Sequence, residues 1–284
     1  MKILAKSRIG ALLIVVAASS ALFAQNSGPD KPLSPAGVLD ARQIMGKSLQ
    51  ATEHSWQARD DYIYVERDED RRLDSTGKVQ SENIDVTKMT LVDGVRFEQL
   101  MEHNGQLPSA EEQRKRNLDL DKLKRETPAE RAARSQKSDE NRAILRDLLK
   151  AFDFRLVGDE IIAGRPTYVF AATPHPGYHA HGPYSKLFSR VEGKLWVDKQ
   201  DFGWVKAEGQ VTQTFSLGLF VARVQRGSRF ILEQTSLGDA VWVPKRIEMR
   251  ANARILLLKS LDLYRVLTYS DYRPAADGAY SVKQ

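Results

Sequence analysis

Hydrophobic positions recur at helical spacing near the start of the chain and at strand spacing over most of the rest. The helical set has one apolar or weakly polar side chain every three or four residues: Val38, Ala41, Met45, Leu49, Thr52 and Trp56. That period marks one buried face of an α-helix. Ser34 and Pro35 are a favoured pair for the N-cap and the first helical position. The pattern therefore predicts a helix from Ser34 to about Trp56.

Strand patterns separated by short turns come next. A strand begins at Tyr62–Val65, and turn signals follow at residues 74–78, 93–94 and 104–105. Between the last two turns, alternate residues from Val95 to Met101 share one face, with Phe97 among them. Turns this closely spaced favour an antiparallel meander over units in which helices connect parallel strands.

The middle of the chain is helical and heavily charged. Ser109 with Glu112, and Thr127 with Glu130, have the spacing of capping boxes that begin helices. Ten basic and eight acidic residues are interleaved between Ser109 and Arg142, which is typical of a solvated helix pair. The stretch Ile144–Phe152 carries a strong apolar stripe, so we expect it to pack against the rest of the protein.

Almost all of the remaining chain has strand character. One hairpin is predicted from Glu160–Ala163 and Thr167–Ala172 around a turn at residues 164–166, and further strands at 194–198, 203–214, 228–236, 241–249 and 261–272. The segment 263–269 has apolar residues on both faces. A sheet wetted on one side does not need this, whereas a curved sheet wrapped around helices or a ligand does.

The first 24 residues have the pattern of an export signal. Lys2, Lys6 and Arg8 precede an apolar run from residue 9 to residue 18, and the run is too short to span a bilayer comfortably. Cleavage is predicted after Ala24, with cleavage after Ala21 as the alternative. Residues 25–33 then form a polar lead-in. We expect residues 34–284 to form one domain, with a charged helical excursion at about 109–152, in the periplasm.

Charge and cysteine content narrow the function. The formal net charge is +6, but three of the basic residues belong to the predicted signal. The pI of about 9.4 therefore does not indicate nucleic-acid binding. The sequence has no cysteine, which excludes disulfides, thiol catalysis and a lipid anchor on cysteine. No second long apolar run follows the signal, so no transmembrane segment is expected in the mature chain.

No catalytic motif stands out. The sequence has no nucleophile elbow, no glycine-rich phosphate loop and no metalloprotease helix motif. Three of the five histidines, His175, His179 and His181, lie in a proline-rich segment. Imidazoles bind zinc or copper, but a surface loop is the simpler interpretation, because no carboxylate lies among them. We therefore predict no catalytic residue, no cofactor and no metal site.

Large apolar side chains are the remaining candidates for a binding site. Trp196, Trp204 and Trp242 lie in predicted strands, where they fill the core or line a cavity. A second group lies around Gly218, as a tucked-in loop or as the rim of a cavity: Phe215, Leu217, Leu219 and Phe220. These seven residues are the predicted hydrophobic ligand lining.

Several short motifs resemble the lipoprotein-localisation-factor (LolA-like) superfamily of exported bacterial envelope proteins. They are Gly193–Asp198, Phe215–Phe220, Val241–Pro244 and Tyr269–Tyr272, together with the turn sequences at 73–78 and 104–108, which resemble one branch of that superfamily. The resemblance implies an α+β fold in which a strongly curved antiparallel sheet forms an unclosed half-barrel, with helices covering its concave face. In that superfamily the concavity holds acyl chains. The charged segment from Ser109 to Arg142 is long for a minimal carrier.

Three functions remain open at this point. The leading hypothesis is a non-enzymatic periplasmic carrier of an apolar ligand, a lipid or an acyl chain, with lipoprotein sorting as a candidate role. The second is a protein-interaction or envelope-sensor module, whose concavity is filled by its own helices and whose charged helices bind a protein partner. The third is a hydrolase without a recognisable motif.

Overall fold

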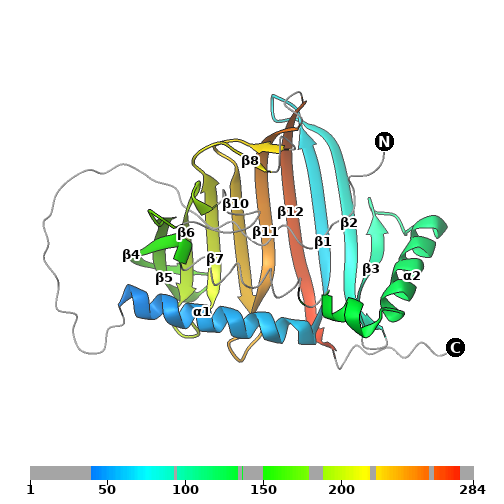
Figure 1. Ribbon diagram of the computed structural model, residues 1–284, viewed down its shortest axis with the longest axis horizontal. Coiled ribbons are helices and arrows are strands. Elements are labelled where there is room, and N and C mark those ends of the chain that lie inside the picture. Colours follow the sequence, from blue (N-terminus) through cyan, green and yellow to red (C-terminus); the bar gives the residue numbers. More distant parts are fainter. Residues whose placement is uncertain are drawn as a thin grey trace, which may run out of the picture.

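A computed structural model describes residues 40–92, 95–133, 136, 150–178, 188–217, 222–255 and 259–275 (Figure 1). The predicted export signal, the lead-in and the proposed helix start at Ser34 lie outside the described residues. So do most of the apolar stripe that precedes Phe152 and the pair Leu219 and Phe220.

The elements that lie wholly within the described residues include two α-helices, a short 3-10 helix and twelve strands, and residues 128–133 are also helical. The helices are α1 (Ala41–Ala58), η1 (Arg59–Asp61) and α2 (Ala110–Lys124). The first five strands are β1 (Tyr62–Leu73), β2 (Val79–Val92), β3 (Val95–His103), β4 (Phe152–Ile162) and β5 (Arg165–Pro174). The others are β6 (Val191–Asp198), β7 (Trp204–Val211), β8 (Phe215–Leu217), β9 (Ala222–Val224), β10 (Arg229–Ser236), β11 (Trp242–Ile255) and β12 (Lys259–Pro274).

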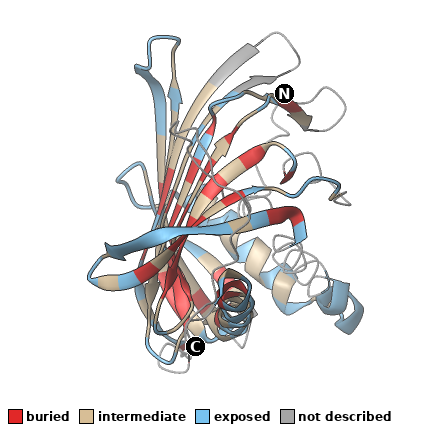
Figure 2. Cartoon of the chain, turned by 90° about the vertical axis from the view of Figure 1, so that its left-hand side faces the viewer, coloured by how far each residue is buried: buried red, intermediate tan, exposed pale blue. Residues whose placement is uncertain are grey.

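The strands form one antiparallel sheet that does not close on itself. Its order is β3-β2-β1-β12-β11-β10-β7-β6-β5-β4, and the short pair β8 and β9 joins it through β11. The two edge strands, β3 and β4, lie at opposite ends of the sheet (Figure 1). Figures 1 and 2 show α1 crossing the concave side of the sheet near one end of the strands. The predicted α+β half-barrel is therefore confirmed.

The long amphipathic helix is present, but it begins later than predicted. Asp40 has an extended backbone and caps α1: its carboxylate accepts a hydrogen bond from the Gln43 N–H at 2.7 Å, and the Gln43 side chain accepts one from the Asp40 N–H at 3.1 Å. This reciprocal capping satisfies backbone groups that the first turn leaves unpaired. The predicted helix from Ser34 to about Trp56 is therefore not continuous, because the extended, capping Asp40 places the start of α1 at Ala41.

The hairpin turns follow local backbone chemistry. At the β1–β2 turn the Asp74 carboxylate accepts hydrogen bonds from the backbone N–H groups of Thr76 and Lys78, as an aspartate-initiated turn does. The β4–β5 turn is tighter than predicted, because only Ala163 and Gly164 form it, both with positive φ. A two-residue turn of this kind matches the twist of the strands, so Arg165 and Pro166 belong to β5 rather than to the turn.

The main core lies between α1 and the sheet. Ile44 and Met45 of α1 pack there against Leu195, Val197 and other buried strand residues. Val169, Trp196 and Val205 are each next in sequence to a residue of this core. Because side chains alternate across a strand, they point to the opposite face of the sheet, where they form a second, smaller cluster with Trp242. By contrast α2 has no buried residue (Figure 2), as predicted for this part of the charged run, whose end beyond residue 136 lies outside the described residues.

Candidate functional site

A small cavity lies under the C-terminal half of α1, between the helix and the ends of β7, β10 and β11. It is lined by Thr52, Ser55, Trp56, Arg59, Gly203, Trp204, Leu232, Gln234, Trp242 and Pro244. Its volume is about 30 Å³, which is close to the volume that one molecule occupies in liquid water. In this conformation the cavity admits a small polar group and has no room for an acyl chain.

Two buried serines of α1 form the walls of this region and attach the helix to the sheet. Trp204 Nε1 donates to Ser48 Oγ at 2.8 Å. The Trp242 backbone N–H donates to Ser55 Oγ at 2.9 Å, and Ser55 Oγ donates to the Ala51 carbonyl one turn earlier. The buried face of α1 is therefore only partly apolar, since hydrogen bonds replace hydrophobic packing at two of its four fully buried positions.

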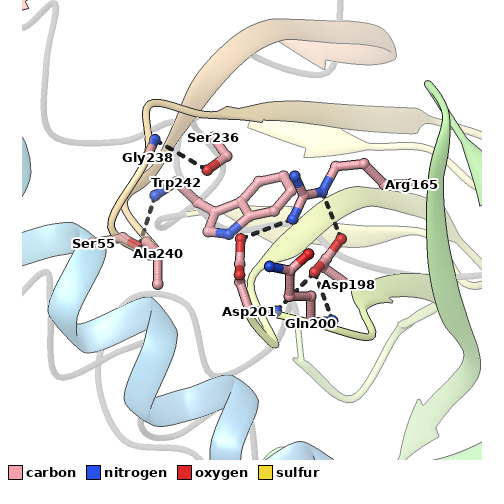
Figure 3. A network of polar contacts seen from close by, with 9 residues as sticks. All are labelled: Ser55, Arg165, Asp198, Gln200, Asp201, Ser236, Gly238, Ala240 and Trp242. Carbon is pink, nitrogen blue, oxygen red and sulfur yellow. Dashed lines mark hydrogen bonds and ion pairs between the residues drawn. The ribbon is translucent and has the colours of Figure 1, made fainter.

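Trp242 is held in place by a close approach to Gly203. A Cβ atom at position 203 would lie 2.1 Å from both Cδ1 and Nε1 of the indole ring, so no side chain fits there. The Arg165 guanidinium lies 5.1 Å from the centroid of the same ring (Figure 3), a cation–π distance. Trp242 Nε1 is buried and has no hydrogen-bond partner among the described residues. A buried donor without an acceptor costs free energy and calls for an explanation.

An aspartate-centred turn positions Arg165 over the ring. Asp198 is almost fully buried and accepts a hydrogen bond from Arg165 Nε at 2.6 Å, as well as from the backbone N–H groups of Gln200 and Asp201 (Figure 3). Arg165 also pairs with the Asp201 carboxylate at 2.8 Å. Burial alone would raise the pKa of Asp198, but these hydrogen bonds outweigh it and hold the pKa below its usual value. The turn therefore keeps a fixed charge pair beside Trp242.

Arg59, at the end of α1, brings a positive charge to the cavity. Its guanidinium lies 5.6 Å from the centroid of the Tyr64 ring and 3.5 Å from the Tyr64 hydroxyl. Tyr64 in turn packs against Tyr269 and Tyr272. Burial raises the pKa of both Tyr269 and Tyr272, so these phenols stay neutral at physiological pH. In the described part of the chain, no carboxylate forms an ion pair with Arg59.

The structure brings together two of the seven predicted lining residues. Trp204 and Trp242 both line the cavity, although the Trp242 ring packs in the smaller cluster on the opposite face of the sheet. Trp196 lies on the opposite face of the sheet, where its Nε1 donates to Glu160 at 2.8 Å and Lys206 covers its ring. Phe215 belongs to the main core and is 4% exposed. The Leu217 side chain, Leu219 and Phe220 lie outside the described residues.

Sequence patterns did not point to Arg59, Gly203 or Ser55. Gly203 was taken as the start of a strand, and no local motif distinguishes a glycine under an indole ring. Ser55 does fall seven residues after Ser48, so both lie on one helix face. That spacing is the one sequence signal that could have indicated polar contacts on the buried side of the helix.

The histidine-rich segment is described only in part. His175 Nδ1 lies 2.8 Å from the Asp153 carboxylate, and both side chains are about half exposed. His179 and His181 lie outside the described residues. Within the residues that the structure does describe, no group of three histidines, aspartates or glutamates is arranged to hold a metal ion. The same described residues include no helix with the length and hydrophobicity needed to cross a membrane.

Comparisons with known proteins give structural neighbours only. No protein-family model matches the chain, and no curated protein matches its sequence. Among solved structures, a domain named for outer membrane lipoprotein sorting, from Vibrio parahaemolyticus, is similar with 13% identity and a TM-score of 0.34, covering 81% of this chain and 92% of its own.

Two further structures are similar at the same level. A LolA superfamily protein from Nitrosomonas europaea has 14% identity and a TM-score of 0.30, over 87% of this chain and 100% of its own. A chain of the MucA/MucB complex of Pseudomonas aeruginosa has 13% identity and a TM-score of 0.21, over 80% and 98%. The superfamily that the sequence motifs resemble thus recurs among the structural neighbours.

Proposed function

We propose that this protein is an exported, periplasmic binding protein that holds the apolar chain of a lipid-like ligand between α1 and the concave face of its sheet. One observation carries the proposal: α1 covers a continuous apolar floor, yet it is attached there by few fully buried apolar side chains. Ile44 and Met45 are the only large apolar residues of α1 that are fully buried, and the other two buried positions are serines.

The energetics favour exchange of the helix for a ligand. Burying one aliphatic side chain contributes about 1.5–3 kcal/mol, so withdrawing Ile44 and Met45 costs about 3–6 kcal/mol, and breaking the Ser48 and Ser55 hydrogen bonds to the sheet adds about 1–3 kcal/mol. An acyl chain contributes about 0.8 kcal/mol per buried methylene, so about eleven methylenes offset the upper total. The cavity of about 30 Å³ then belongs to the closed state, and α1 acts as a lid that a long chain displaces.

A fluorescent fatty-acid probe tests this proposal. If α1 competes with the ligand, Ile44→Ser should weaken the lid and raise probe affinity, because the lid-open state then costs less to reach. Gln50→Ala, on the exposed face of the same helix, is the matched control and should leave affinity unchanged. Failure of the unmutated protein to bind any apolar probe would exclude a carrier. Native mass spectrometry of protein purified from the envelope would identify a ligand that copurifies.

The small cavity volume also favours a second candidate, a protein-interaction module whose concavity is permanently filled by α1. In that case α2 is the candidate partner surface, since none of its residues is buried and it is densely charged. The same experiment separates the two candidates. A permanently filled concavity predicts that Ile44→Ser lowers stability without creating probe binding.

The cellular location follows from the N-terminal signal rather than from the fold. We infer cleavage after Ala24 and release of the mature chain into the periplasm, supported by the basic residues, the short apolar run and the small residue that ends it. N-terminal sequencing of protein from the envelope should find Gln25 first. A start at Leu22 would move the cleavage site, and an intact Met1 would exclude export by this signal.

A further inference from the structure

The strand at one end of the sheet, β4, has an outer edge without a neighbour. Among the described residues β4 pairs with β5 alone, so its other side presents backbone groups that no strand satisfies. Residues 155–161 are all exposed (Figure 2). Three of them are large and apolar, namely Leu156, Val157 and Ile161, and Ile161 is 73% exposed. At the other end of the sheet α2 packs beside β3 (Figure 1). The β4 edge is therefore the one to which a further strand can add.

The sequence of β4 does little to prevent such pairing. The strand contains no lysine and no proline, which are common on protected edges. Its ladder with β5 is interrupted by a bulge at Val157, which has no partner on β5. Leu156, before the bulge, pairs with a β5 residue of the main core, and Gly158, after it, pairs with one of the smaller cluster. Even-numbered residues therefore point to the concave face before the bulge and to the opposite face after it.

A second copy of β4 fits this edge in an antiparallel register that matches both faces. Phe154 packs against the main core, so Arg155 beside it points to the opposite face. Glu160 points there too, since it accepts a hydrogen bond from Trp196 Nε1. Arg155 of one copy can therefore lie opposite Glu160 of the other, and a two-fold axis repeats this pair. The same register sets Phe154 opposite Ile161 on the concave face.

Charge distinguishes this register from its neighbours. A shift by one residue would put concave side chains opposite outward ones, so the competing registers are shifts by two. One of these puts Asp153 opposite Glu160, and the other puts Arg155 opposite Ile162. Opposite charges that face each other across a strand pair stabilise it, and like charges destabilise it. Arg155 makes no ion pair within the described part of the chain, so its charge is available to a second copy.

We propose that β4 is a self-association edge, at which two copies of this chain pair their β4 strands antiparallel about a two-fold axis, with Arg155 of each opposite Glu160 of the other. The two bulges then face each other, so the strands pair residue for residue. Over residues 153–162 the contact is about 33 Å long. A single strand edge is a small interface, so the dimer should dissociate on dilution. This proposal is independent of any ligand in the concavity.

Sedimentation velocity over a dilution series tests the dimer. The unmutated protein should pass from dimer to monomer as it is diluted. Arg155→Glu should raise the dissociation constant by about tenfold or more, because both symmetry-related pairs then bring like charges together. Glu160→Lys should have the same effect for the same reason.

A mixture of these two variants tests the register itself. When one copy carries Arg155→Glu and the other carries Glu160→Lys, opposite charges face each other again at both pairs. Mixed dimers should therefore form with about the affinity of the unmutated protein, while neither variant dimerises well alone. Native mass spectrometry with one variant labelled with heavy nitrogen distinguishes the mixed dimer from the two others.

Two further variants make the test specific. Ile161→Lys adds the charge that protected edges use, and it should weaken the dimer even if Glu160→Lys is unstable through loss of the contact with Trp196. Leu107→Lys is the matched control, since Leu107 is an 83% exposed apolar residue away from this edge. It should leave association unchanged. Thermal unfolding of each variant shows whether the fold is intact.

The remaining outcomes would overturn the proposal. A protein that stays monomeric at every concentration would exclude self-association, including the case in which β4 instead accepts an extended segment of another protein. A dimer that survives both Arg155→Glu and Ile161→Lys would place the contact elsewhere, and so would one that Leu107→Lys disrupts. If Arg155→Glu and Glu160→Lys each weaken the dimer but their mixture does not restore it, the proposed register is wrong.

Discussion

Burial at Phe215 determines what a charge would do there. The residue was predicted to be the rim of a cavity, where an introduced aspartate stays solvated, but it is 4% exposed and packs in the main core. A carboxylate in that place would lose its hydration without gaining a partner. We therefore expect Phe215→Asp to abolish cooperative thermal unfolding. Leu107→Asp is the control, since Leu107 is 83% exposed, and its melting temperature should stay that of the unmutated protein.

Asp198 gives the fold a defined pH dependence. Its pKa is lower in the folded protein than in the unfolded chain, so the unfolded state binds more protons and the ionised carboxylate stabilises the fold. That stability is present above the unfolded pKa, about 3.9, and is lost as the pH falls through the lower folded value.

Urea unfolding as a function of pH measures this contribution. Asp198→Asn should lower the free energy of unfolding by about 1–3 kcal/mol at pH 7, because it weakens charge-assisted hydrogen bonds to a buried group. The difference from the unmutated protein should shrink below about pH 4. Asp159→Asn removes a 60% exposed carboxylate and should cost less than about 1 kcal/mol at any pH. A difference for Asp198→Asn that stays constant with pH would contradict the assignment.

At the scale of elements, α1 is the part whose attachment differs from that of the strands. The strands are joined to one another by continuous ladders, whereas α1 is tied to the sheet through Ile44, Met45 and the contacts of Ser48 and Ser55. Segments held by few buried contacts open separately from the rest of a fold. We infer that α1 is such a segment.

Hydrogen exchange tests whether α1 opens separately. Ser55→Ala leaves the Trp242 backbone N–H without its acceptor and should ease opening of α1 by about 1–3 kcal/mol, a roughly 5- to 150-fold acceleration if exchange follows that opening. Amides in α1 should therefore exchange faster, while those in β11 and β12 keep their rates. Gln50→Ala on the exposed face serves as the control. Equal acceleration in helix and strands would mean that α1 opens only with the whole protein.

The sequence predicted the elements well where local chemistry determines them. The Asp74–Lys78 turn, the Ser109 capping box and the strand predicted at 241–249 are all present. The start of α1 was wrong, because Ser34–Pro35 and Asp40 both have the residue types of a helix start, and local preference does not decide between them. The β4–β5 turn was predicted at residues 164–166 rather than at 163–164 for a similar reason, because proline is also common in turns.

At the scale of the whole molecule, the site depends on contacts that no local pattern encodes. Arg165 and Trp242 lie 77 positions apart in the sequence and meet because β5 and β11 both begin at the same end of the sheet. The close approach of Gly203 to the Trp242 ring likewise depends on the folded sheet and not on a local sequence pattern. Tryptophans in strands suggested a cavity, but their alternation could not show which face α1 covers. Trp196 was therefore predicted to line the ligand site, whereas in the structure it lies on the opposite face of the sheet.

The length of the ligand should report on the whole assembly of sheet and lid. If the chain replaces α1 on the apolar floor, saturated carboxylates shorter than about eleven methylenes should bind weakly, because they do not offset withdrawal of the helix. Above that length each methylene should tighten binding by about fourfold, from about 0.8 kcal/mol per buried group. Thermal unfolding measures this at one fixed concentration, since a ligand of the folded state raises the melting temperature with affinity. A melting temperature independent of chain length would mean that the chain is not buried and that α1 stays on the sheet.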